Sequence, residues 1–591
     1  MTDPIPKLGD EQTNTAFARW LAIAYATMTL GFILYVAWVA IRSHYTAPNV
    51  DDWRILDDLF SSPLLNWIFE NQNGHRVPVT LTLFFLDYRF FDGHMHLLTL
   101  ASLACTGLAI AILVRTLRTE RATRDPVAII WISFACFLLS WAASRHDLAW
   151  GMNQGTLMAA MWCTVCVTCI AVVLHQKNRG ETLGTLPLVA AAVAAVFATF
   201  SQGVGFSCWA GLLVLAVVVR LPIRVTALYA IGAAITLGVY ISGVEIPMYD
   251  SPKMYTELVT RLPGRLIEFT VALVGASASA LTPSGWVDDV RNVALTLGAT
   301  GITIFGAFTA FTLFRRPHLS SFDLFAIGLP TTAIIGGLMI ALNRHFWPDH
   351  AMDLRFSTWS ALFWVGLAFI PPAICARSTT KSPRLAIVSA LLVFVMSVQF
   401  TVNLQTAHTA QRVRTTKLNY LSTMHLLGIQ WDQWPGGTLV KEPERVYRVA
   451  ERLRQESRSF FTEARARYPG SSIAKDFKII GSKHCEGGMS SATPIQTRDG
   501  LALVVSGWAK SRKSERKIDQ ILITGQRGII EGLASFVHRD ATLTHTKFSP
   551  QDDPWAGFLR HPKGNPPYRA FALFDDGESV CKLDIKFPNF P

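Results

Sequence analysis

The first long polar interruption of the chain reads NVDDWRILDDLFSSPLLNWIFENQNGHR, residues 49–76. It follows an apolar run, residues 20–41, that is long enough to cross the hydrocarbon core of a bilayer as a helix. The interruption combines acidic pairs with a His-Arg pair and several aromatic residues. Ionisable residues gathered at a membrane edge are candidates for function. We therefore expect the chemistry of this chain in its first loop, residues 43–93.

The composition indicates a polytopic α-helical membrane protein. Of 591 residues, 50% are hydrophobic and only 16% are charged, whereas soluble domains carry about 25% charged residues. The mean hydropathy is +0.31. The net charge of +12 is explained by retention of Arg and Lys on the cytoplasmic side of a membrane. No basic run with interleaved aromatic residues is present, so nucleic acid is not an expected partner.

Apolar runs recur through the first 404 residues and predict about eleven membrane spans. They cover residues 20–41, 94–115, 127–144, 156–175, 187–202, 204–220, 225–244, 292–313, 324–343, 356–375 and 384–404. Residues 266–283 are also apolar, but a crossing there would reverse the later loops. Glu268 and the small residues that follow it predict a re-entrant or interfacial segment instead.

Basic loops alternate with acidic or aromatic loops, and this alternation fixes the expected orientation. The N-terminus, residues 1–19, is expected in the cytoplasm, with the chain retained in the cytoplasmic (inner) membrane. An odd number of spans then places the C-terminus outside. Five polar segments gather on the outer face in this arrangement. They are residues 43–93, 144–154, 202–205, 245–291 and 343–355.

The composition changes after residue 404. Residues 405–475 predict a juxtamembrane helical connector, and residues 476–591 predict a small extracytoplasmic β-rich domain of the sandwich type. The expected strands are 501–508, 520–524, 529–536, 568–574 and 581–587. Cys485 and Cys581 are the two cysteines outside the spans. They either form a disulfide or remain two buried thiols.

A carboxylate loop over a lipid-accessible face suits transfer of a group from a membrane-anchored phosphate donor. Asp51 or Asp52 would take the proton of an attacking hydroxyl; alternatively, one of them caps a helix that begins near Trp53. Arginine pairs with phosphate oxygens, although single arginines at a membrane edge are more often snorkelling or loop-pairing residues. The predicted phosphate or donor ligands are His75, Arg76, Arg145, Arg344 and Arg355, and the predicted substrate-binding residues are Trp53, Glu70, Asn73, Asn153 and Gln154.

Four histidines also fall on the predicted outer face, at positions 75, 146, 345 and 350. Their spacings match no established metal-ligand pattern. Neither a metal nor another cofactor is expected.

The order of these features resembles the C-type (GT-C) superfamily of integral membrane glycosyltransferases. The resemblance rests on the Asp51-Asp52 pair after the first span and on residues 73–76, Asn-Gly-His-Arg, before the second. It also rests on residues 145–154 and on the segment Leu-Arg-Phe-Ser-Thr-Trp at 354–359. Many relatives have Tyr after the late arginine, where this chain has Phe356.

The resemblance implies a polyprenyl-phosphate sugar as donor, a glycan, lipid or protein of the cell envelope as acceptor, inversion at the anomeric carbon and an Asp base in the first loop. The alternative is a non-catalytic membrane component of a polysaccharide assembly or export machine. A transporter ranks last, because the chain shows no clear internal repeat.

Overall fold

The computed structural model describes the chain except for residues 1–7, 44–45, 50, 73–74, 120–124, 144–153, 243–251, 282–288, 316–317, 345–347, 378–382, 432–442, 513–515, 526, 538–552, 561–566 and 588–591. The chain divides into two compact units. Unit 1 contains residues 1–44, 68–83 and 97–407. Unit 2 contains residues 45–67, 84–96 and 408–591, so the first loop contributes to both.

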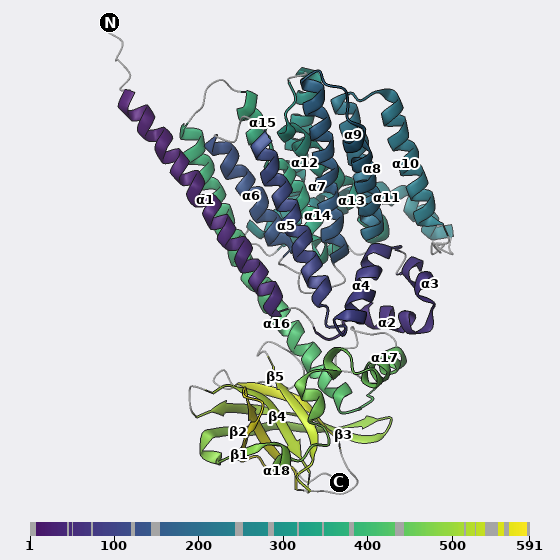
Figure 1. Cartoon of the computed structure of the whole chain (residues 1–591), viewed down its shortest axis with the longest axis vertical. Coiled ribbons are helices and arrows are strands. Elements are labelled where there is room, and N and C mark those ends of the chain that lie inside the picture. Colours follow the sequence, from purple (N-terminus) through teal and green to yellow (C-terminus); the bar gives the residue numbers. More distant parts are fainter. Residues whose placement is uncertain are drawn as a thin grey trace. The chain divides into compact units, whose positions relative to one another are not determined.

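Unit 1 is a bundle of helices (Figure 1). Its members are α1 (Leu8–Ser43), α5 (His96–Thr119), α6 (Pro126–Ala142), α7 (Gln154–Asn178), α8 (Thr185–Ser201), α9 (Ser207–Val219), α10 (Ile223–Ile241), α11 (Pro252–Ala276), α12 (Val290–Arg315), α13 (Ser321–Arg344), α14 (Ser357–Leu367), α15 (Ile370–Arg377) and the first part of α16 (Pro383–Leu426). Long apolar segments become helices because a helix satisfies every backbone hydrogen bond internally, as lipid requires.

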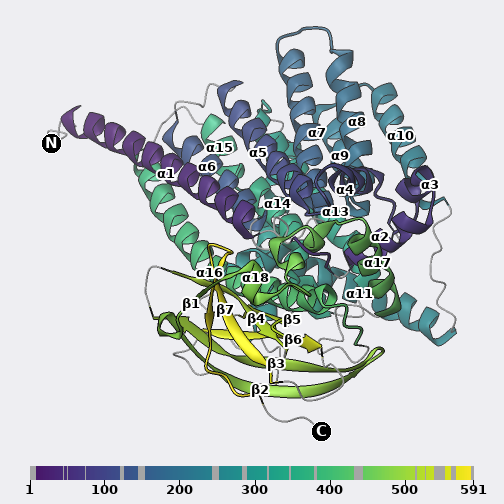
Figure 2. The ribbon, with the colours of Figure 1, turned by 60° about the horizontal axis from the view of Figure 1, so that its bottom comes forward.

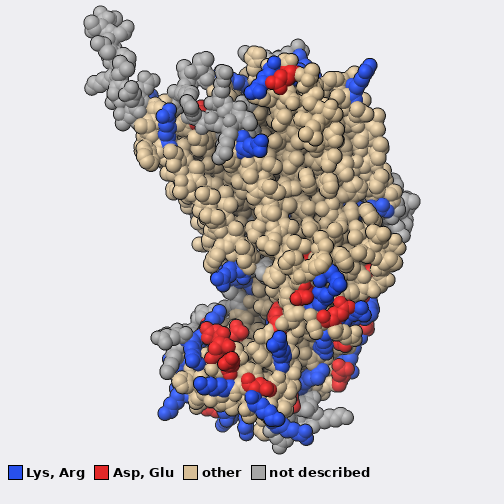
Figure 3. All heavy atoms as spheres, viewed as in Figure 1, with Lys and Arg blue, Asp and Glu red and all other residues tan. Residues whose placement is uncertain are grey.

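Helices occupy all eleven positions at which spans are predicted. Among the described residues, eight segments are long and apolar enough to cross a membrane. The other three positions hold shorter apolar helices, Pro126–Ala142, Thr185–Ser201 and Gly203–Val219. Figure 3 shows a broad uncharged surface on the viewed face of the bundle. Unit 1 is thus a helical bundle whose described residues include eight apolar helices of membrane length, and eleven crossings remain a prediction.

Small residues let the helices of unit 1 approach closely. A Cβ on Gly275 of α11 would lie 1.8 Å from the Ala294 carbonyl oxygen of α12, and one on Gly298 would lie 2.0 Å from the Val271 carbonyl oxygen. Between helices in lipid, packing of this kind replaces the hydrophobic effect as the source of association. The α11–α12 contact therefore depends on glycine at both positions.

The segment predicted to be re-entrant or interfacial forms the second half of α11 and a 3-10 turn, Ala278–Leu281. Glu268 pairs with Arg291 in the first turn of α12 at 2.5 Å. The backbone N–H of Ser277 donates to Ser360 Oγ near the start of α14 at 2.8 Å. Thr270 lies against Gly337 in the last part of α13. All of these contacts are with residues near one end of the bundle.

The first loop forms α2 (Asp51–Ser61), α3 (Leu64–Phe69) and α4 (Pro78–Phe90). In unit 2 its residues pack against α17 (Pro443–Gln455) and the turns that follow. Asp57 lies 3.1 Å from Arg445 and 2.8 Å from Arg448. Tyr88 hydrogen-bonds to Glu456. The helix α16 continues 22 residues beyond the predicted end of its span at residue 404, to Leu426.

The C-terminal strands form one eight-stranded sheet in the order β1-β8-β7-β4-β5-β6-β3-β2 (Figure 2). The strands are β1 (Lys478–Ile480), β2 (Cys485–Thr497), β3 (Gly500–Ser511), β4 (Ile518–Thr524), β5 (Ile530–Phe536), β6 (Pro554–Arg560), β7 (Arg569–Phe574) and β8 (Ser579–Lys582). Only the β1–β8 pair is parallel among these neighbours. Four of the predicted strands correspond to β3, β4, β5 and β7, whereas the fifth, residues 581–587, overlaps β8 only at residues 581–582.

The predicted sandwich of two sheets is not confirmed, because the strand pairing is continuous from one edge to the other. A disulfide joins Cys485 on the edge strand β2 to Cys581 on β8, next to the opposite edge. The sheet therefore curls so that its two ends meet. Its inner side chains, among them Trp555, Leu503 and Phe574, form the core of the domain. On the other face Tyr420 of α16 contacts Phe558, with ring centroids 4.6 Å apart.

Candidate functional site

Polar side chains from several segments meet at one end of unit 1. Thr80 Oγ1, in the first turn of α4, donates to the Ser201 carbonyl at the end of α8 at 2.9 Å. Gln154 Nε2, at the start of α7, donates to the Thr80 carbonyl at 3.4 Å. Trp359 Nε1 of α14 donates to Gln202 Oε1 at 3.3 Å. These segments are among those that the sequence places together on one face.

His75 joins this end of the bundle through Tyr240 of α10. Its Nδ1 lies 3.1 Å from the Tyr240 hydroxyl. A Cβ on Gly203 would lie 2.0 Å from that hydroxyl and 3.0 Å from Nδ1, so the close approach requires glycine. We call His75, Thr80, Gln154, Gln202, Tyr240 and Trp359 the His75 cluster.

The electrostatics of the His75 cluster favour a neutral imidazole. Burial lowers the pKa of His75, and the positive charge of Arg344 at the end of α13 lowers it further. Arg344 is therefore close enough to act on the ring. A neutral imidazole held by a tyrosine hydroxyl is able to accept a proton or to donate one hydrogen bond to an anion.

Gln154 is fully buried, and its Oε1 has no hydrogen-bond partner among the residues that the structure describes. Leaving a buried acceptor unpaired costs about 1–3 kcal/mol. A hydroxyl group of a bound molecule would satisfy this oxygen. The substrate-binding role of Gln154 stays a prediction.

Arg76 and Arg355, two further predicted phosphate ligands, bind other parts of the protein. Arg76 Nη1 donates to the Val239 carbonyl at 3.3 Å and to Ser242 Oγ at 3.4 Å, and so stabilises the C-terminus of α10. Arg355 pairs with Asp353 at 2.6 Å and lies over the ring of Phe356. Arg145, Asn73 and Asn153 lie outside the described residues.

The two predicted bases, Asp51 and Asp52, both belong to unit 2 but have different surroundings. Asp52 is 1% exposed, and its Oδ2 accepts the backbone N–H of Asn49 at 2.8 Å. The Asp52 N–H in turn donates to the Asn49 carbonyl at 2.7 Å. The Asp52 carboxylate thus makes one half of a capping box at the start of α2, whereas the Asp52 N–H bonds to the Asn49 carbonyl and not to the Asn49 side chain. Asp51 is half-buried in the same helical turn.

Two predicted substrate-binding residues of the first loop also differ in exposure. Trp53 is 5% exposed and packs near His425 and Phe460, with ring centroids 5.5 and 6.4 Å away. It is a core residue of unit 2. Glu70 is exposed, after the end of α3. Of the two side chains, that of Glu70 is the one exposed at the surface.

Tyr240 and Gln202 were not predicted as site residues. Tyr240 closes an apolar run, where an aromatic residue is ordinarily read as a membrane-interface anchor. Gln202 stands between two apolar runs and reads as a turn residue. Their shared location follows from tertiary packing, and no local sequence signal indicates it.

No group of three or more His, Cys, Asp or Glu side chains within the described ranges is arranged to hold a metal ion. The absence of a cofactor stays a prediction.

Comparisons with protein-family models, with curated proteins and with solved structures found no match to this chain.

Proposed function

We propose that the chain is a membrane glycosyltransferase of the C type, which transfers a sugar from a polyprenyl-phosphate donor to a glycan, lipid or protein acceptor of the cell envelope. The observation that carries this proposal is the His75–Tyr240 pair beside the charge of Arg344, at one end of a bundle of membrane-length helices. A lipid-linked sugar phosphate keeps its chain in the bilayer and presents its phosphate at the membrane surface, where the ends of membrane helices are expected.

In the proposed reaction the acceptor hydroxyl attacks the anomeric carbon, and the polyprenyl phosphate leaves with the bonding electrons. His75 and Arg344 stabilise the departing phosphate by hydrogen bonding and charge. The buried Oε1 of Gln154 accepts a hydroxyl of the sugar. Inversion follows from a single displacement.

The acceptor hydroxyl must lose its proton to a base, and we assign this role to Asp51. The carboxylate of Asp52 is buried and engaged by the Asn49 backbone, which leaves it little capacity to collect a proton from a substrate. General base catalysis typically contributes a factor of about 10²–10⁴ to the rate.

Contacts within unit 2 support the eleven-span topology. Residues 57 and 88 of the first loop contact residues 445 and 456 beyond the last apolar helix. Both sets therefore lie on one side of the membrane, and the number of crossings between them must be even. Within the described part of the chain, seven long apolar helices follow α1. Adding all three shorter helices gives ten, whereas counting α11 as well gives an odd number.

The same topology places the sheet domain and the His75 cluster outside the cytoplasmic membrane. The Cys485–Cys581 disulfide supports this placement, since disulfides persist in oxidising compartments. Lys177, Arg220 and Arg377 belong to helix ends opposite the His75 cluster, as the positive-inside rule expects of cytoplasmic ends.

A second candidate function is a non-catalytic component of a polysaccharide assembly machine. It is favoured by the structural use of the first-loop acids, because Asp52 caps α2 and Asp57 pairs with two arginines of α17. In that case the sheet domain docks a glycan or a partner protein without turnover.

The test is transfer of labelled sugar from a panel of polyprenyl-phosphate sugars by the purified full chain. We expect Asp51→Asn to reduce turnover at least 100-fold per folded molecule. Tyr240→Phe, which removes the hydroxyl that positions His75, should reduce it about tenfold and shift the pH profile. Asp58→Asn in the same helix is the matched control and should retain activity.

Full turnover by Asp51→Asn would reject this residue as the base. Absence of incorporation from every donor, together with measurable binding of glycans, would favour the assembly component.

A further inference from the structure

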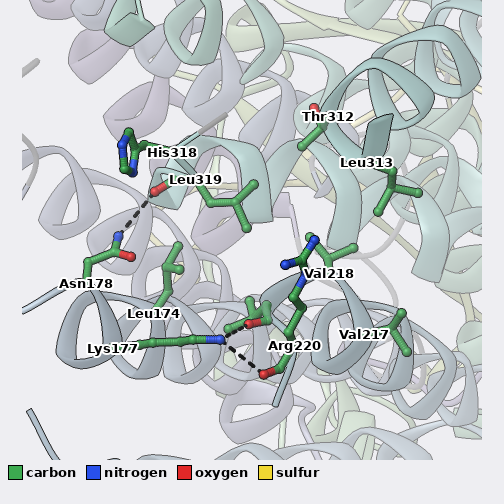
Figure 4. Close-up of a pocket in the computed structure, with 11 residues that line it drawn as sticks. Leu174, Lys177, Asn178, Val217, Val218, Arg220, Thr312, Leu313, His318 and Leu319 are labelled. Atoms are coloured by element: carbon green, nitrogen blue, oxygen red, sulfur yellow. Dashed lines mark hydrogen bonds between the residues drawn. The ribbon is translucent and has the colours of Figure 1, made fainter. Parts of the chain in front are cut away.

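A cavity of about 220 Å³ lies at the ends of α7, α9 and α12, away from the His75 cluster. Figure 4 shows its lining residues. The three helices finish at Asn178, Val219 and Arg315, so backbone carbonyl groups point toward this region. Helix C-termini carry a partial negative charge, which by itself would repel anions.

Lys177 offsets that charge. Its Nζ donates to the Val219 carbonyl at 2.7 Å and to the Arg220 carbonyl at 3.1 Å. These two bonds engage two of the three donors of the ammonium group. Arg220 supplies a second positive charge to the lining of the cavity.

Arg220 directs its side chain into the cavity. The residue caps α9 in the left-handed conformation, with φ 54° and ψ 59°. Figure 4 shows its guanidinium group projecting towards the space bounded by Thr312, Leu313 and Leu319. No described residue forms a side-chain hydrogen bond or ion pair with this guanidinium group. A planar cation with several donors is thus available for a phosphate.

The opposite wall of the cavity is apolar and opens towards lipid. Val217 is 63% exposed and Leu313 is 46% exposed, on helices of a membrane-type bundle. Thr312 is 3% exposed, and its Oγ1 has no hydrogen-bond partner among the described residues. The cavity therefore combines a cationic part, a buried hydroxyl and an open apolar wall.

We propose that this cavity binds the headgroup of an anionic phospholipid. Arg220 and the third donor of Lys177 bind the phosphate, while the first methylene groups of an acyl chain lie along Val217 and Leu313. Basic pockets at the ends of membrane helices recognise lipid headgroups in this way. A soluble phosphate would leave the exposed apolar wall without a function. The site is independent of the proposed glycosyl transfer.

The test is binding of phosphatidylglycerol to the purified full chain by native mass spectrometry, with phosphatidylcholine as the zwitterionic comparison. Arg220→Asn removes the guanidinium group and retains a residue that tolerates the left-handed conformation. We expect it to weaken phosphatidylglycerol binding about fivefold, since one cation near the surface contributes about that factor. Arg224→Asn is the matched control, because Arg224 is exposed in the first turn of α10 and does not line the cavity.

Equal weakening by the two arginine variants would overturn the proposal, since lipid would then bind through diffuse charge. Competition by glycerol phosphate at the affinity of the lipid would also overturn it, in favour of a soluble anion. If Arg220→Asn does not fold, the Thr312→Val variant tests the proposal in its place. Selective loss of phosphatidylglycerol in that variant supports the site, and unchanged binding rejects it.

Discussion

Different kinds of interaction stabilise the interior of unit 1 and the interior of unit 2. In unit 1, helices meet at glycines such as Gly275 and Gly298, and buried hydroxyls donate to nearby carbonyls. In unit 2, a disulfide, an apolar sheet core and pairs such as Asp57 with Arg445 predominate. The difference follows from the solvent: lipid offers no hydrophobic effect between helices, whereas water drives a sheet to bury its core.

The largest expected effect is a loss of stability in unit 2, with unit 1 unchanged. The Cys485–Cys581 disulfide closes a loop with a sequence separation of 96 residues. By the chain-entropy estimate its removal costs about 4.7 kcal/mol. In Cys581→Ser, we expect hydrogen exchange to accelerate in peptides from 485–583 and to stay unchanged in peptides from α7 and α9. Cys375→Ser removes a free thiol and should alter neither region.

The next effect breaks unit 1. Gly298→Ala places a methyl group 2.0 Å from the Val271 carbonyl oxygen, so α11 and α12 must separate. Overpacking of this kind costs up to about 3 kcal/mol. We expect a lower thermal midpoint in detergent and faster exchange in α11, with an unchanged sheet domain. In the same helix, Gly306→Ala meets no atom within 4 Å and should be neutral or slightly stabilising.

The sequence predicts the helices of unit 1 better than the strands of unit 2. Apolar runs of sufficient length leave the backbone no alternative to a helix, and the eleven predicted positions all hold helices. Sheet pairing is non-local, and β2 contains Gly487, Gly488 and Pro494, which hide it from a search for alternating apolar residues.

The candidate site likewise has features that the sequence predicts and features that it does not. The segments of the outer face are predicted from charge and hydropathy, because each is a local interruption between spans. The pairing of His75 with Tyr240 joins residues separated by 165 positions and depends on where α10 ends. The capping role of Asp52 has a local signal, since Asn49 stands three residues before it.

The third prediction uses acid to weaken unit 2 selectively. Burial, and after it the positive charge of Arg454, together lower the pKa of His425 to about 3. The unfolded chain has a histidine pKa near 6.5. Protonation therefore favours the unfolded state as pH falls from about 6.5 towards 3, and the cost of this group at pH 5 is about 2 kcal/mol.

Stability measured at pH 7 and pH 5 on the wild type and on His425→Gln isolates this residue, because the histidines with lowered pKa values elsewhere, His75, His94 and His408, remain in both. A wild-type chain with the same acid sensitivity as the variant would contradict the prediction.

The smallest expected effect on stability distinguishes Asp51 from Asp52 in the first loop. Asp52→Ala removes the acceptor of the Asn49 N–H and should destabilise unit 2 by about 1 kcal/mol. Asp51→Ala removes a charge from the first turn of α2 and should cost less, roughly 0.3–0.5 kcal/mol.

The proposed catalytic roles predict the reverse order for turnover per folded molecule, with Asp51 essential and Asp52 dispensable. Denaturant titration and the transfer assay on the same two preparations give both orders. If stability and turnover rank the two aspartates alike, then loss of activity reports only loss of fold, and the base must be sought outside this helix.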